Sequence, residues 1–180
     1  MRIERGRYDD AATFEAYLDS VVKNAELWRA VHRTATVDGE AVERLRHVAR
    51  GWRFLALSED WCTDAVSTLP VIAQLAGRAG VELRLLARDA NPDVMDVHLT
   101  SGTRSIPVVM GLDAGGEVRA WWGPRPSVLQ RWMRTEAAWL PKEDRTRRKR
   151  AWYARDRGRS SVAEVVDMVE RAARRSAESG

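Results

Sequence analysis

The stretch "SEDWCTDAVSTLP", residues 58–70, contains the single cysteine of the chain, Cys62, directly after Trp61. A single cysteine excludes an internal disulfide and the usual zinc site built from several thiolates. Because the three histidines, His32, His47 and His98, also lack the spacing of metal ligands, we expect no bound metal. What remains is the chemistry of one thiol, which as a thiolate attacks a disulfide and forms a mixed disulfide. The alternative is an inert residue, because lone cysteines are often buried and unreactive.

The residues around Cys62 predict where this thiol lies in the fold. "WRFLALS", residues 52–58, is a short and almost continuously apolar run, which is typical of an interior strand. The residues that follow Cys62 have helical spacing up to Gly80. Pro70 lies inside this helix, where it removes one backbone hydrogen bond and introduces a kink. We therefore expect Cys62 at the end of a strand and at the first turn of a helix.

This position has two opposite effects on the thiol. Free N–H groups and the helix dipole favour an anion at a helix start, and so they lower the pKa of a cysteine there. The carboxylates of Glu59, Asp60 and Asp64 are close in sequence, and nearby negative charge raises the pKa of a thiol. The sequence alone leaves this balance open.

The elements after the first helix predict an α/β fold. Residues 81–89 alternate like a strand, and residues 91–102 read as a short helix that begins with an asparagine cap and a proline. Residues 106–113 and 117–123 are separated by a glycine-containing turn, which predicts an antiparallel hairpin. Because the first β-α-β unit should be parallel with a right-handed crossover, we expect a four-stranded mixed sheet with helices on both faces.

Helical patterns flank this central region on both sides. The apolar spacing predicts helices over residues 10–33 and 39–50 before it, and further helices from residue 125 onward. A chain of this length suggests one domain. We divide it into three parts that pack together: a helical extension (1–50), a core (51–140) and a second helical extension (141–180).

These features together resemble the thioredoxin family. The apolar strand ends in Trp61-Cys62, where that family begins its Trp-Cys-x-x-Cys site, and Pro70 lies eight residues after the cysteine, as does the helix-kinking proline of the family. Pro107 lies 45 residues after Cys62, close to the family's spacing to its cis-proline. The resemblance covers about residues 50–140. It implies a thioredoxin-like fold, with a cis Ile106–Pro107 bond and the preceding loop facing Cys62.

The chain departs from the family pattern at Ala65, which occupies the position of the second cysteine. It is similar to a bacterial branch of thioredoxin-like proteins that has a Trp-Cys-x-Asp-Ala site and extra helices. The resemblance implies a single-cysteine oxidoreductase whose partners are protein or small-molecule thiols and disulfides. Glutathione or another low-molecular-weight thiol would be the co-substrate, and no other cofactor is expected. Two alternatives remain: a redox-inactive module that holds an extended peptide between Trp61 and Pro107, and a peroxide sensor that forms a sulfenic acid at Cys62.

The resemblance also implies a set of substrate-binding residues around Cys62: Trp61, Thr63, Asp64, Arg104, Ser105, Ile106 and Pro107. Trp61 either shields the thiol and faces a partner or is a core aromatic residue. Thr63 either donates to the sulfur or simply begins the helix, and we favour the second reading. Asp64 is a proton acceptor or a partner of the helix dipole, and again the second reading is favoured.

The loop before the proline offers both a charge and backbone groups. Arg104 either steadies a thiolate or a ligand carboxylate, or it forms a surface salt bridge, which we favour. Ser105 and Ile106 offer backbone groups to an extended peptide or to glutathione, as in strand pairing.

The charge of the chain is concentrated in one segment. The net charge is +4, and residues 142–159 carry nine basic and three acidic residues, so the rest of the chain sums to −2. The run "RTRRKRAWYARDRGR" interleaves basic and aromatic residues, which suits phosphate or RNA. We favour a solvated helix with Trp152 and Tyr153 packed on the core, and so expect no nucleic acid partner. No signal-like or membrane-spanning run occurs, so a cytoplasmic location is expected; the oligomeric state stays open.

Overall fold

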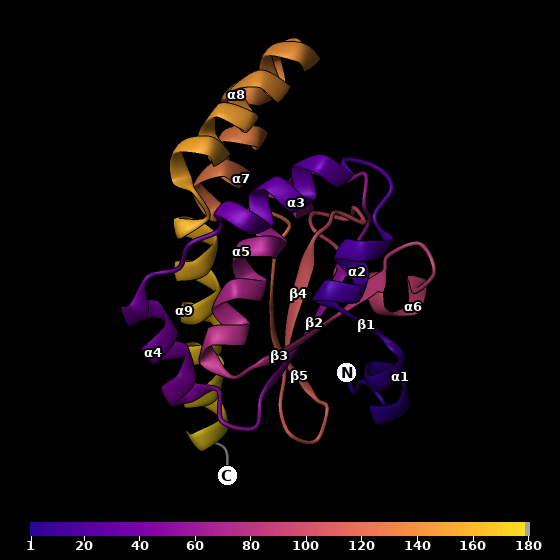
Figure 1. The fold of residues 1–180 in the computed structure, drawn as a ribbon, viewed down its shortest axis with the longest axis vertical. Helices are drawn as coiled ribbons and strands as arrows, with labels where there is room; N and C mark the ends of the chain where they lie inside the picture. Colours follow the sequence, from indigo (N-terminus) through magenta and orange to yellow (C-terminus); the bar gives the residue numbers. More distant parts are fainter. Residues whose placement is uncertain (179–180) are drawn as a thin grey trace.

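A computed structural model of the protein describes residues 1–178 and shows one β-sheet between two layers of helices (Figure 1). The five strands run in the order β1-β3-β2-β4-β5. Their bounds are β1 (Ala12–Thr13), β2 (Arg53–Ser58), β3 (Glu82–Ala87), β4 (Val108–Leu112) and β5 (Val118–Trp122). None of the helices in residues 1–178 has the length and apolar character needed to cross a lipid bilayer.

The sheet is mixed, as the sequence predicts. β2 and β3 are parallel, whereas β4 runs antiparallel to both β2 and β5. This arrangement confirms the parallel β-α-β unit and the hairpin. The strand count differs by one, because the short strand β1 adds to the edge of the sheet by pairing antiparallel with β3.

Nine α-helices and one 3-10 helix are described in residues 1–178. They are α1 (Arg5–Asp10), α2 (Phe14–Ser20), α3 (Ala25–Thr34), α4 (Gly39–Val48), α5 (Thr63–Ala79), α6 (Pro92–Met95), α7 (Ser127–Arg134), the 3-10 helix η1 (Glu136–Trp139), α8 (Lys142–Asp156) and α9 (Arg159–Glu178). The helix α5 contains Pro70, and eleven of its 17 residues are buried, as is typical of a helix that follows an interior strand.

The single helix expected over residues 10–33 is wrong. This stretch instead forms β1, α2 and α3. The break between the two helices has a distant cause: Oδ2 of Asp60 accepts hydrogen bonds from the backbone N–H groups of Val22 (3.1 Å) and Lys23 (2.8 Å). Asn24 then adopts a left-handed conformation with φ of 56°. A helix cannot continue through N–H groups that are bound by another segment, and sequence periodicity does not show this competition.

The helices lie on both faces of the sheet, and β5 shows which helix covers which face. Successive residues of a strand point to opposite faces. Trp121 meets the His98 ring that follows α6 in an edge-on contact with centroids 5.7 Å apart. The indole Nε1 of its neighbour Trp122 donates to Oε2 of Glu164 in α9 at 2.8 Å. α6 and α9 therefore cover opposite faces of the sheet.

One continuous core joins the flanking helices to the sheet. Trp28 of α3, Leu45 of α4, Phe54 of β2, Leu69 of α5 and Val165 of α9 are all fully buried in the same cluster. Because both ends of the chain contribute to this cluster, the flanking helices hold the central elements from both sides.

The turn between α8 and α9 lies directly against α5. Gly158 has φ of +81°, and a Cβ atom at this position would lie 2.5 Å from Cγ1 of Val71. Only glycine accepts both the left-handed conformation and this close approach. The contact brings the C-terminal half of α8 next to α5, the helix that begins after Cys62.

Candidate functional site

Cys62 lies where the sequence predicts, after β2 and at the N-cap position of α5. The residue is buried, with 8% of its surface exposed. Its Sγ atom donates a hydrogen bond to the backbone oxygen of Ile106 across a distance of 3.4 Å. The cysteine is therefore a neutral thiol in this arrangement, with its proton directed at the loop that precedes Pro107.

The loop facing Cys62 contains the predicted proline. The Ile106–Pro107 peptide bond is cis, and both residues are buried. Ser105 is half-buried, and its hydroxyl lies 2.8 Å from the hydroxyl of Thr103. The structure thus brings Ile106 and Pro107 together with Cys62, while the Ser105 side chain is engaged within its own loop.

Burial is the main influence on the Cys62 thiol, and it raises the pKa of this group above the ordinary value. The backbone N–H groups of Asp64 and Ala65, at the start of α5, act in the opposite direction and favour the thiolate. The carboxylate of Asp64 raises the pKa further, and the ammonium group of Lys149 lowers it. The balance that the sequence left open therefore favours the protonated thiol.

Trp61 is the exposed edge of the site. It is 42% exposed, and the guanidinium carbon of Arg88 lies 4.9 Å from the centre of its ring. A cation at this distance over an indole ring is attracted to its π electrons. Of the two readings that the sequence allowed for Trp61, the exposed position favours a surface that faces a partner.

Two of the three acids near Cys62 are engaged in fixing the backbone around it. The carboxylate of Asp60 holds the turn between α2 and α3, and its backbone oxygen accepts from Nε1 of Trp28 at 3.0 Å. Oε1 of Glu59 accepts from the N–H of Asp89 at 2.9 Å. Both acids therefore position the segment that carries the cysteine.

The third acid, Asp64, is the centre of a buried polar cluster. Its Oδ2 atom accepts from Nη2 of Arg125 at 2.6 Å, and its Oδ1 atom accepts from the hydroxyl of Tyr153 at 2.9 Å. Nζ of Lys149 lies 3.0 Å from the same Oδ1 and donates to Oγ1 of Thr63 at 3.2 Å. The side chain of Asp64 is only 6% exposed. We call these five residues the Asp64 cluster.

The charges in the Asp64 cluster fix the protonation of its members. Burial alone would raise the pKa of the Asp64 carboxyl, but the positive charges of Arg125 and Lys149 outweigh it, so that the pKa lies below its usual range. Burial and the Asp64 charge raise the pKa of Tyr153 well above the ordinary value, and so its hydroxyl remains a donor. Asp64 is therefore an ionised anchor with both oxygens engaged, which is a poor arrangement for a general base.

The sequence did not identify Arg125, Lys149 or Tyr153 as part of the site. They come from the loop before α7 and from α8, at least 60 residues after Asp64. The only local signal is that Lys149 and Tyr153 are four residues apart, which places them on one face of a helix. Nothing in the sequence pairs that face with α5.

Arg104 forms a bidentate salt bridge with Asp96, at 2.6 and 2.7 Å. Both side chains are about half exposed. Arg104 therefore lies in the loop before Pro107, but its guanidinium group is directed to a surface acid, in line with the reading that the sequence favoured. Within residues 1–178, no group of three or more histidine, cysteine or acidic side chains is arranged to hold a metal ion.

Comparisons with known proteins agree with this architecture. A family model described as thioredoxin matches residues 11–140. No curated protein matches the chain. Two crystal structures share its fold: a protein of unknown function from Pseudomonas aeruginosa (19% identity, TM-score 0.74, covering 94% of this chain and 99% of that one) and an HIV epitope-scaffold (18% identity, TM-score 0.69, covering 91% and 94%).

Proposed function

The chain belongs to the thioredoxin family, and from this premise we propose that it is a single-cysteine thiol oxidoreductase that forms mixed disulfides through Cys62. One observation carries the proposal: the thiol lies at the start of α5, 3.4 Å from the backbone oxygen of Ile106, the residue before Pro107. The partners would be protein or low-molecular-weight thiols and disulfides, with glutathione as a suitable co-substrate.

The proposed exchange has two steps. In the first, Cys62 loses its proton to solvent and its sulfur attacks a substrate disulfide; the substrate S–S bond breaks, and one half leaves as a thiolate that takes up a proton. In the second, the thiolate of an external thiol attacks the substrate sulfur of the mixed disulfide; a new disulfide forms between these two, the bond to Cys62 breaks, and the Cys62 thiolate takes up a proton. Because Ala65 replaces the resolving cysteine of a dithiol site, the second thiol must come from outside the chain.

The surroundings of Cys62 set the expected rate of this exchange. The attacking species is the thiolate, and burial raises the pKa of Cys62, so only a small fraction is ionised near neutral pH. The N–H groups of Asp64 and Ala65 and the charge of Lys149 favour the thiolate once it forms. We therefore expect thiol–disulfide exchange at Cys62 to be slow at neutral pH and faster at alkaline pH.

A second candidate is a redox-inactive module that binds an extended peptide. The buried thiol and Ala65 favour this alternative, because both reduce turnover. In this case the exposed Trp61 and the neighbouring Pro107 loop would contact the peptide, and Cys62 would only pack beneath it.

Glutathione disulfide distinguishes the two candidates. Wild-type protein and the Cys62→Ser variant are incubated with it between about pH 7 and pH 9.5, on both sides of the reference thiol pKa of about 8.5, and intact mass is recorded. The oxidoreductase proposal predicts one glutathione adduct on the wild type, removed by added glutathione, and none on the variant. If natively folded wild-type protein forms no adduct at any of these pH values, the proposal is wrong and the binding module becomes the better account.

A further inference from the structure

The positive charge of the protein is concentrated in residues 125–159, which we call the basic arm. They contain twelve basic and four acidic residues, a net charge of +8, so that the other residues sum to −4. Arg125 and Lys149 are largely buried against Asp64, but the other ten basic residues still exceed the four acidic residues by six. A local excess of this size on an otherwise acidic protein creates a positive surface. Such a surface is the electrostatic footprint of a site for a polyanion.

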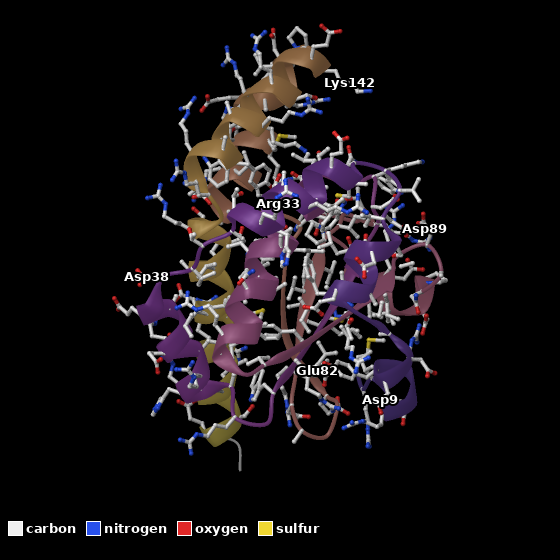
Figure 2. All side chains as sticks on the ribbon, viewed as in Figure 1. Asp9, Arg33, Asp38, Glu82, Asp89 and Lys142 are labelled. Atoms are coloured by element: carbon white, nitrogen blue, oxygen red, sulfur yellow. The ribbon has the colours of Figure 1, made fainter. Side chains whose placement is uncertain are left out.

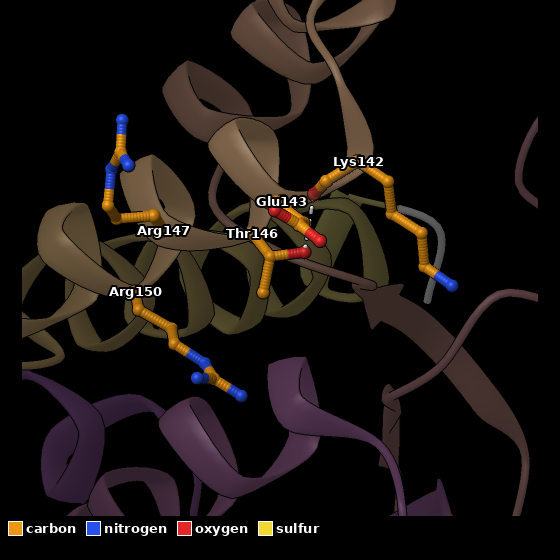
Figure 3. Close-up of a pocket in the computed structure, with 5 residues that line it drawn as sticks. All are labelled: Lys142, Glu143, Thr146, Arg147 and Arg150. Atoms are coloured by element: carbon orange, nitrogen blue, oxygen red, sulfur yellow. Dashed lines mark hydrogen bonds between the residues drawn. The ribbon is translucent and has the colours of Figure 1, made fainter.

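The basic arm also projects from the molecule. α8 extends beyond α3 and the sheet, with α7 beside it (Figure 1). Charged side chains point outward along this helix, and Lys142 lies at its far end (Figure 2). Lys142, Glu143, Thr146, Arg147 and Arg150 line an open hollow on one side of α8 (Figure 3). A long ligand can therefore reach the arm without entering the Cys62 site.

Most arginines of α8 have no acidic partner among the described residues. Arg147 pairs with Asp144, but four others on the helix form no ion pair in residues 1–178: Arg145, Arg148, Arg150 and Arg155. Like charges three or four residues apart on a helix repel each other, and a bound polyanion removes this repulsion. Arginine is also the side chain best suited to phosphate, because its planar guanidinium group donates two parallel hydrogen bonds.

A tryptophan lies next to these charges. Trp139, in η1 directly before α8, is 91% exposed. An indole ring in this position leaves its apolar surface in water without packing against the protein, and it provides a flat surface on which a nucleic acid base can stack. The exposure of Trp139 is independent of the positive charge. A ligand with both phosphates and exposed bases would bind the arginines through its phosphates and stack on Trp139 through a base.

The aromatic residues within α8 argue against a different polyanion, the membrane surface. An amphipathic helix that inserts between lipid headgroups needs an apolar face. In α8 the large apolar side chains are used elsewhere: Tyr153 is buried against Asp64, and Trp152 is half-buried with its ring 5.4 Å from that of Tyr153. Most of the other side chains of the helix are charged.

From these observations we propose that the basic arm binds single-stranded nucleic acid, through arginine contacts to phosphates and stacking of a base on Trp139. The sequence alone favoured a solvated helix, and Tyr153 does pack on the core. Two features that the sequence did not show change this reading: the helix projects from the body, and Trp139 is uncovered beside it. The proposal does not depend on the chemistry of Cys62.

Fluorescence anisotropy with a labelled 20-nucleotide oligouridylate, as a function of salt concentration, tests the proposal on the full chain. The test variant is Arg148→Gln/Arg150→Gln, and Trp139→Ala probes the stacking. The matched control is Arg171→Gln/Arg174→Gln, because these exposed arginines lie on α9, away from the arm, and the change in net charge is the same. Circular dichroism verifies that all variants are folded.

We expect the wild type and the control to bind alike. The test variant should bind more weakly, with a slope of log affinity against log salt reduced by about 1.4, since each lost phosphate contact on a single strand contributes about 0.7. Trp139→Ala should weaken binding about tenfold. The proposal is overturned if the wild type does not bind the oligonucleotide in low salt, if both double variants lose affinity equally, or if the protein binds phosphatidylserine vesicles and not the oligonucleotide.

Discussion

Replacement of Asp64 by asparagine tests the structural role of the Asp64 cluster. Asparagine has nearly the same shape, so the variant removes the negative charge without leaving a cavity. Arg125 and Lys149 then face each other's charge with no counterion, in a region where their side chains are only 16% and 14% exposed. The amide nitrogen also brings donors to a position where three other donors already converge.

The cost of this change follows from burial. Removing one partner of a buried ion pair destabilises a protein by about 3–5 kcal/mol, because the remaining charge is left uncompensated. For a chain of this size, that corresponds to a decrease in Tm of about 6–20 °C. A matched control is Asp96→Asn, which breaks the bidentate salt bridge with Arg104 on the surface. Exposed pairs contribute about 0–1 kcal/mol, so the control should barely change Tm.

Urea denaturation of the wild type and both variants measures these differences directly. The pH dependence gives a second readout. The folded-state pKa of Asp64 is lowered, so its stabilising contribution is present above the unfolded pKa of about 3.9 and is lost as the pH falls through the folded value. The stability difference between wild type and Asp64→Asn should therefore shrink only in acid, below about pH 4. Equal losses of stability in Asp64→Asn and Asp96→Asn would show that the buried Asp64 cluster stabilises the fold no more than a surface salt bridge does.

Three further predictions follow from the same contacts. Gly158→Ala should destabilise the protein by about 1–3 kcal/mol in urea denaturation, because the added methyl group overlaps Val71 at a left-handed backbone position; Gly80→Ala, at a position of similar φ with open space around it, should cost less. Lys149→Met should slow alkylation of Cys62 at about pH 8, since it removes the positive charge that favours the thiolate; an unchanged rate would exclude this role. Arg104→Ala should leave the rate of glutathione adduct formation within about twofold of wild type, because its guanidinium group is bound to Asp96; a large loss would place Arg104 in the substrate site.

The central elements could be predicted from the sequence because their signals are local. Each pattern predicts the structure of the residues in which it occurs. The apolar run predicts β2, the helical spacing around an internal proline predicts α5, and the glycine-containing turn predicts the β4–β5 hairpin. The N-terminal helix was predicted too long, since the groups that end it belong to Asp60, 36 residues after Asn24. The two-residue strand β1 is too short for an alternating pattern to appear.

In the candidate site, too, some features could be predicted from local sequence and others depend on distant contacts. The position of Cys62 at a strand–helix junction follows from local periodicity, and its approach to Ile106 follows from the family resemblance. The partners of Asp64 cannot be predicted from the sequence, because they lie next to it only where α8 packs against α5 at Gly158. The pKa of Cys62 is raised mainly by burial, which depends on the whole fold and cannot be predicted from the residues next to Cys62 in the sequence.

If Cys62 is a reactive but largely protonated thiol, as we propose, its alkylation should depend on pH in a characteristic way. Native protein is treated with iodoacetamide across the neutral and alkaline range, and the labelled fraction is followed by intact mass. We expect a single labelled site whose labelling rate follows one ionisation, with a midpoint above the reference thiol pKa of about 8.5. A midpoint below that value would show that burial does not dominate at Cys62. Absence of labelling while the protein remains folded would contradict the proposed exchange chemistry.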